Sequence, residues 1–112
     1  MGCVYILENP AMPDLIKIGQ TGGTAQVCAD ELYTTGVPLP FKIVHEYPCE
    51  NHAQLGRAIH QKLAPHRYDQ NREFFEYPAD DAYQLLRDLE DRSYRRWTSH
   101  FLTRFKKKAE TP

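Results

Sequence analysis

Residues 2–7 read Gly-Cys-Val-Tyr-Ile-Leu, and residues 15–19 read Leu-Ile-Lys-Ile-Gly. The first stretch is a run of β-branched and aromatic residues, and the second alternates in the way that strands do. Pro10 and Pro13 lie between them and mark a turn. The two stretches therefore predict a β-hairpin at the start of the chain, and the rest of the fold is interpreted around it.

Helical and strand-like patterns alternate after this hairpin. Thr24 is a suitable cap for a short helix that extends to about Tyr33, and residues 41–47 alternate as a third strand. Asn51, with Gln54 three residues later, resembles a capping box at the start of a second helix.

A short last strand over residues 73–77 precedes a long helical pattern that starts at Pro78. The order strand–strand–helix–strand–helix–strand–helix predicts an α/β chain of the α+β kind. We expect a small mixed sheet of three to four strands, flanked by helices, and a long C-terminal helix. The domain is placed over residues 1–90, and a basic amphipathic C-terminal helix and tail over residues 91–112.

Composition indicates an ordinary globular protein. The 112 residues leave room for one hydrophobic core, and 41% apolar with 26% charged residues is typical of soluble domains. No apolar run approaches the roughly 18 residues of a membrane span, and the first residues do not resemble a signal peptide. We therefore expect a cytoplasmic protein without a membrane partner. The three cysteines are far apart and form no CxxC pair, so we expect neither a zinc site nor a disulfide framework.

The net charge of −1 hides an uneven distribution of charge along the chain. Residues 1–90 carry seven Lys/Arg against thirteen Asp/Glu, which gives −6, whereas residues 91–112 carry seven against two, which gives +5. A protein that holds phosphate backbones usually spreads positive charge over its binding face. An acidic body with a basic tail therefore argues against nucleic-acid binding by the whole body.

Several short motifs follow one another in register. Residues 2–7 are similar to the first motif of the GIY-YIG nuclease superfamily, and residues 17–21 to the second, in the form where lysine replaces the first tyrosine. Further matches occur at residues 31–32, 35–38, 40–41, 60 and 71–75. Over about residues 2–85 the chain resembles the compact phage and bacterial branch of that superfamily.

The resemblance implies a defined chemistry. Members of the superfamily cut nucleic-acid phosphodiesters with one divalent ion, which would be Mg²⁺ or Mn²⁺ here. A tyrosine lies near the attacking water, an arginine on the first helix steadies the phosphate, and a glutamate on a later helix holds the metal. These roles are physically reasonable, since negative charge developing on phosphoryl oxygens needs a fixed cation and the metal acidifies its water.

The resemblance carries three site residues directly onto this chain. Tyr5 matches the motif tyrosine, His60 matches the histidine of this branch, and Lys17 is the lysine of the second motif. Each residue also has an ordinary structural interpretation: Tyr5 as a core aromatic, His60 as a hydrogen-bonded core histidine and Lys17 as a solvated hairpin residue. These alternatives remain open at the level of sequence.

Three other positions depart from the family pattern. The arginine position is Cys28, the metal-binding glutamate position is Gly56, and the lysine that usually follows the second motif is replaced by Gln20. A thiol lacks the charge and forked donors of a guanidinium, and a glycine offers no carboxylate and weakens its helix by about 1 kcal/mol. Arg57 is expected to point some 100° away from position 56 around the helix, and so to replace neither group. Glu73 is the one candidate for a relocated metal ligand.

The C-terminal helical pattern suggests a contact surface. Tyr94, Trp97, Phe101 and Phe105 recur at spacings of three and four residues, so they share one helix face. One interpretation packs this stripe on the domain's own sheet. The other makes it a partner surface or a homodimer seam. The residues that we expect to contact a partner are Arg92, Arg95, Arg96, Trp97, Phe101, Arg104, Lys106, Lys107 and Lys108.

Three functions fit these observations. In the first, the chain is a catalytically degenerate GIY-YIG nuclease-like domain, without a cofactor, that binds a protein or nucleic-acid partner in phage–host defence or counter-defence. In the second, it is an active endonuclease dependent on Mg²⁺ or Mn²⁺ that uses Tyr5, His60 and Glu73. In the third, weaker hypothesis, it is a regulatory subunit that dimerises through the C-terminal helix.

Overall fold

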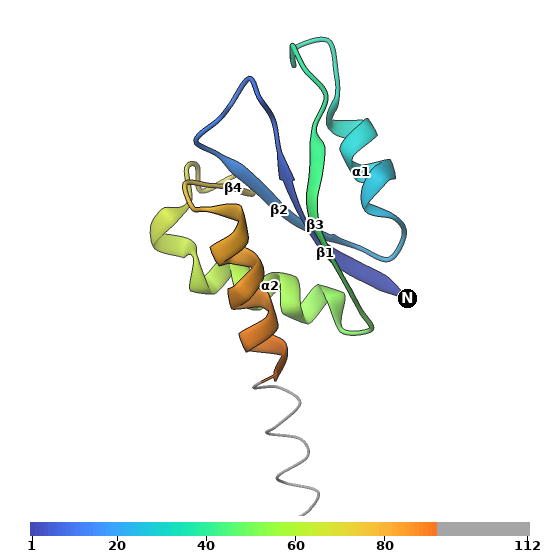
Figure 1. Cartoon of the computed structure of the whole chain (residues 1–112), viewed down its shortest axis with the longest axis vertical. Helices are drawn as coiled ribbons and strands as arrows, with labels where there is room; N and C mark the ends of the chain where they lie inside the picture. The colour runs from blue at the N-terminus through green and yellow to red at the C-terminus, as the bar shows by residue number, and fades with distance from the viewer. Residues whose placement is uncertain (92–112) are drawn as a thin grey trace, which may run out of the picture.

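The predicted order of elements is confirmed by the computed structural model, which describes residues 1–91. Figure 1 shows the arrangement of these elements. Their bounds are β1 Gly2–Glu8, β2 Ile16–Thr21, α1 Ala25–Leu32, β3 Lys42–Cys49, α2 His52–Lys62, a short 3₁₀ helix η1 Ala64–His66, and β4 Phe74–Phe75. A last helix begins at residue 79 and includes residue 91, the end of the described part.

The four strands form one sheet in the order β3-β1-β2-β4. The α+β class is confirmed, but the sheet is antiparallel at every neighbouring pair, so the expectation of a mixed sheet is wrong on this point. The reason is the position of β1. It pairs with β2 as a hairpin on one side and with β3, which returns in the opposite direction, on the other.

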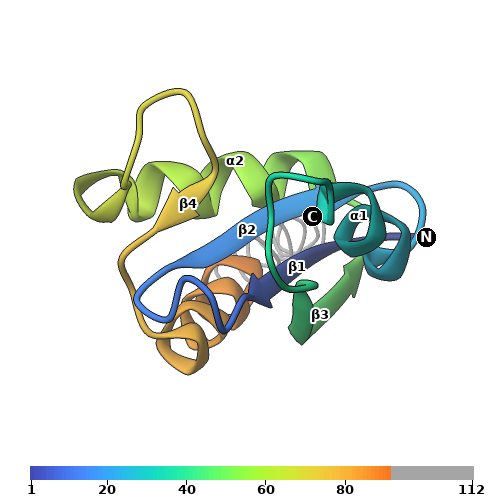
Figure 2. The same ribbon diagram turned by 90° about the horizontal axis from the view of Figure 1, so that it is seen from above.

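Each face of the sheet carries its own apolar cluster, because side chains alternate along a strand. Val4 and Ile6 pack with residues of α2 and the C-terminal helix, whereas Cys3, Tyr5 and Leu7 pack with α1. Figure 2, a view from above, shows α2 passing behind β2 while α1 lies near the N-terminal end of β1. The sheet is therefore a central layer between α1 and the two later helices.

The two predicted helix caps have different outcomes. The Thr24 hydroxyl accepts a hydrogen bond from the Val27 N–H at 3.3 Å, as expected. Asn51 is also an N-cap, but its side chain makes no capping hydrogen bond, so the expected capping box is wrong. Its ψ of 38° lies outside the extended region from which a capping side chain normally reaches the following N–H groups.

The first turns of the C-terminal helix belong to the domain. Ala82 and Leu86 are fully buried in the cluster beneath α2. His45 on β3 binds Asp80 at 2.7 Å and stacks on Tyr83 with ring centroids 4.3 Å apart. The predicted partner-contact segment, Arg92 to Lys108, lies outside the described residues. Within residues 1–91, no helix is long and apolar enough to cross a membrane.

Candidate functional site

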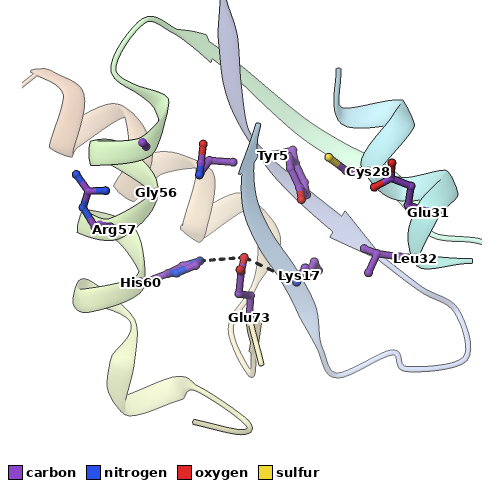
Figure 3. A pocket seen from close by; sticks show the side chains of 11 residues that line it. Tyr5, Lys17, Cys28, Glu31, Leu32, Gly56, Arg57, His60 and Glu73 are labelled. Carbon is purple, nitrogen blue, oxygen red and sulfur yellow. Dashed lines mark ion pairs between the residues drawn. The ribbon is translucent and has the colours of Figure 1, made fainter. Parts of the chain in front are cut away.

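A polar pocket of about 510 Å³ lies where strand pairing along β2 ends. β4 pairs only with Ile16 and Lys17, so within residues 1–91 the rest of β2 has no strand on its outer side. Figure 3 shows the pocket between α2 and α1, with β2 passing through it. All seven site residues predicted in the domain line this pocket: Tyr5, Lys17, Gln20, Cys28, Gly56, His60 and Glu73.

Tyr5 forms part of the pocket wall from the central strand. Its side chain is only 6% exposed and packs with the cluster beneath α1. Burial raises the pKa of the phenol well above its ordinary value, and the neighbouring Cys28 and Glu73 add to the rise. Tyr5 is therefore neutral at physiological pH, and its phenol can donate a hydrogen bond but is a poor base.

Cys28 lines the pocket from α1 and points toward Tyr5 (Figure 3). Its thiol is free and half-buried. The thiols of Cys3 and Cys49 are also free, but they are buried. The first helix thus reaches the pocket where the resemblance places an arginine, but it supplies no positive charge there. Glu31, one turn further along α1, brings a carboxylate to the same wall.

Lys17, Glu73 and His60 form a connected polar group, in which the Glu73 carboxylate lies between the other two side chains (Figure 3). Glu73 Oε2 lies 3.7 Å from Lys17 Nζ and 3.8 Å from His60 Nε2. The Lys17 side chain is 14% exposed, and burial lowers the pKa of its ammonium, an effect that Glu73 partly offsets. Among residues 1–91, Lys17 is the only lysine that lines this pocket, and it is already paired with a carboxylate.

His60 is held by the backbone of β2. Its Nε2 lies 2.8 Å from the carbonyl oxygen of Ile18, which can only accept, so Nε2 carries the proton and donates. The ring also packs on Phe75, with centroids 5.2 Å apart. This geometry favours the interpretation of His60 as a hydrogen-bonded structural histidine, with Nδ1 as its one remaining ring acceptor.

Gly56 is buried on α2 and faces Gln20 on β2. A Cβ atom at position 56 would lie 2.9 Å from Gln20 Cγ and 3.2 Å from Gln20 Cβ. Gln20 Oε1 in turn accepts a hydrogen bond from His52 Nδ1 at 2.6 Å. The glycine thus allows α2 to approach β2 closely. The sequence had indicated only that Gly56 weakens its own helix.

The side chains present do not fit the divalent ion that the resemblance implies. The carboxylates of residues 1–91 in the pocket are Glu31 and Glu73, on different segments of the chain, and Glu73 is already paired with Lys17. No three His, Cys, Asp or Glu side chains of residues 1–91 come together as a metal-binding group. A hard divalent ion needs a dedicated carboxylate anchor, and position 56 supplies none.

Sequence reasoning missed part of the α2 wall. Arg57 borders the pocket together with Ala53, Gly56 and His60. These residues are spaced at i, i+3, i+4 and i+7, so they form one stripe, and that spacing was the available signal. Figure 3 shows the Arg57 side chain directed away from Tyr5 and Glu73.

The pocket brings Tyr5, Lys17, His60 and Glu73 together beside β2. The family model described as the T5orf172 domain matches residues 2–90, and the chain belongs to this phage-associated family of nuclease type. Searches of curated proteins and of solved structures gave no match.

Proposed function

We propose that this chain is a GIY-YIG-type nuclease domain that has lost cleavage and acts by binding a partner. One observation carries the proposal. Cys28 and Gly56 line the same pocket as Tyr5 and His60, at the places where the resemblance puts the arginine and the metal-binding glutamate. The positions matched to the arginine and the glutamate thus lie beside the positions matched to the tyrosine and the histidine.

Loss of these two groups removes the largest electrostatic contributions to phosphodiester cleavage. Without the guanidinium from α1 and the carboxylate-bound ion, the pocket lacks the two groups that would meet the negative charge developing on phosphoryl oxygens. Lys17 does not replace them, because Glu73 lies 3.7 Å from its ammonium. Glu31 and Glu73 also balance the charges of Lys17 and Arg57 in the lining of the pocket.

The charge of the described body favours a protein as the partner. Residues 1–91 carry seven Lys/Arg against fourteen Asp/Glu. Such a surface repels phosphate backbones and attracts a basic protein surface. In a phage-associated family, that partner would be a component of host defence or phage counter-defence, for example an active nuclease.

The test of lost cleavage uses the purified full chain. It is incubated with single- and double-stranded DNA and RNA in the presence of Mg²⁺ or Mn²⁺. We expect no cleavage above a buffer control. Turnover that disappears in Tyr5→Phe would contradict the proposal. If a nucleic-acid complex forms without cleavage, its affinity should fall steeply with salt, since basic side chains would be displacing counterions.

The alternative is an active metal-dependent endonuclease, and the position of Glu73 favours it. Its carboxylate is 43% exposed, lies in the pocket with Tyr5, and is 3.8 Å from His60 Nε2. A divalent ion bound there would have to displace Lys17. Mn²⁺ binding that is lost in Glu73→Gln but kept in the exposed control Glu76→Gln would support this alternative.

A further inference from the structure

We propose that Gln20 and Gly56 are a matched pair in which the Gln20 side chain, held in place by His52, occupies the volume that a metal ligand from position 56 would need. This inference rests on the proposed assignment of Gly56 to the metal-binding glutamate position. It adds that the room for a ligand from position 56 has been filled by another side chain, so that the site is not merely short of one ligand.

The closeness of α2 to β2 is the first observation. Gly56 is buried although Gln20, which covers it, is itself exposed to solvent. A Cβ at position 56 would lie 3.2 Å from Gln20 Cβ, an atom fixed to the strand, and 2.9 Å from Gln20 Cγ. A larger residue at position 56 must therefore turn the Gln20 side chain about χ1 to move Cγ, and must still shift α2 slightly away from Gln20 Cβ.

His52 opposes that turn. Its Nδ1 donates to Gln20 Oε1 at 2.6 Å, so rotating the glutamine breaks a hydrogen bond. The imidazole packs directly against the backbone of Gly2. A Cβ at position 2 would lie 2.7 Å from His52 Nε2 and would also contact Cδ2. Gly2 thus makes room for His52, and His52, one turn before Gly56 on α2, holds Gln20.

If Gln20 fills this volume, a glutamate introduced at position 56 is not sufficient to create a metal site. A glutamate at position 56 would have to extend through the stem of Gln20 before its carboxylate reached the pocket. Even with that carboxylate restored, the position stays closed as long as Gln20 is held by His52. The pocket then offers its ligand the Gln20 amide, the Lys17 ammonium and the Tyr5 phenol, and no metal ion.

The first test measures coupling between positions 20 and 56 by thermal unfolding. In the unaltered background, Gly56→Ala should lower Tm, because the new methyl group meets Gln20. In Gln20→Ala the same change should lower Tm by about 4 °C less, since the 2.9 Å contact with Cγ is gone, only the 3.2 Å contact with the Cβ of residue 20 is left, and alanine favours the helix. His52→Phe keeps a ring on Gly2 but frees Gln20, so Gly56→Ala should be better tolerated there.

Gly36→Ala is the matched control, because a Cβ at position 36 has no neighbour within 4 Å. Its effect on Tm should be the same in all three backgrounds. An equal effect of Gly56→Ala in the wild type and in the Gln20→Ala variant would overturn the inference. Wild-type cleavage of DNA or RNA would instead contradict the proposed loss of activity and leave this coupling intact.

The second test uses Mn²⁺ itself as the probe, followed by the loss of the free-ion signal in electron paramagnetic resonance. Neither the wild type nor Gly56→Glu should reduce that signal, whereas Gly56→Glu combined with Gln20→Ala should. Circular dichroism checks that each variant is folded. Mn²⁺ binding by Gly56→Glu with Gln20 intact, or none by the combined variant, would overturn the inference that Gln20 closes the ion position.

Discussion

The phenol of Tyr5 lies directly over Gly19, its partner across the β1–β2 pair. A Cβ at position 19 would come within 2.9 Å of Tyr5 Cε1, and closer still to Cζ and the hydroxyl oxygen. The glycine therefore sets where the phenol lies. Gly19, in the second motif, thus positions Tyr5, in the first motif, at the pocket.

Gly19→Ala should destabilise the domain by about 1–3 kcal/mol, the usual cost of overpacking a well-packed position. The added methyl group has to displace an aromatic ring that is itself buried. Urea denaturation measures the effect. Gly22→Ala is the control, because the nearest atoms to a Cβ there are 3.9 Å away. Equal stability of the two variants would show that the ring moves aside freely.

Tyr5 should also make the domain sensitive to alkaline pH. Its pKa is raised in the folded state, so above the ordinary value near 10 the unfolded chain loses this proton first. Stability is then fully present below pH 10 and falls as the pH rises above it. We expect a loss of about 1 kcal/mol by pH 11, which is absent in Tyr5→Phe.

The control for this pH effect is Tyr68→Phe, because Tyr68 is 65% exposed. That variant should lose stability above pH 10 just as the wild type does. Lys17 contributes with the opposite sign, since its pKa is lowered, but it is present in all three proteins and cancels in the comparison. Identical pH profiles of Tyr5→Phe and Tyr68→Phe would contradict the prediction.

Lys17→Met should leave the domain as stable as the wild type, or roughly 1 kcal/mol more stable. The ammonium is poorly hydrated in its present position, whereas the Glu73 side chain is 43% exposed and stays in contact with solvent without it. Chemical denaturation checks the stability. If the pocket is the binding site, the same change should weaken partner binding, whereas Lys42→Met on the exposed edge of β3 should not.

The sequence predicted which residues gather at the pocket, because that depended on motif spacing and strand alternation. Tyr5 and Lys17 are brought together by the hairpin register, and His60 and Gly56 by one helix turn. The role of Gln20 could not be predicted. It depends on how closely α2 approaches β2, a tertiary distance that no local pattern encodes. His52 was missed for the same reason.

The domain should remain folded when the chain is truncated after Glu90. Every buried residue of the described part lies before this point, and the family match also ends there. Circular dichroism and thermal unfolding test this, and loss of partner binding by the truncated protein would assign the contact to residues 91–108. Leu86→Ala is the comparison, since emptying a fully buried position should cost about 2–5 kcal/mol.

Restoring catalysis should require three changes together. Cys28→Arg supplies the cation, Gly56→Glu supplies the carboxylate, and Gln20→Ala makes room for it. Because these groups act on one transition state, their effects are not additive, and the triple variant should nick DNA while each double variant does not. A plasmid-nicking assay with Mn²⁺ measures this. Nicking by Cys28→Arg with Gly56→Glu alone would mean that Gln20 is no obstacle.

The central position of β1 affects how the chain can fold. β1 comes first in the sequence, yet its two edges are filled by β2 and by β3, which ends only at Cys49. Pairing over such a separation is slow, and until it is complete one edge of a strand that is buried on both faces stays exposed. Fragments that end before residue 42 therefore present an apolar, unpaired strand edge, and we expect them to aggregate during synthesis or refolding.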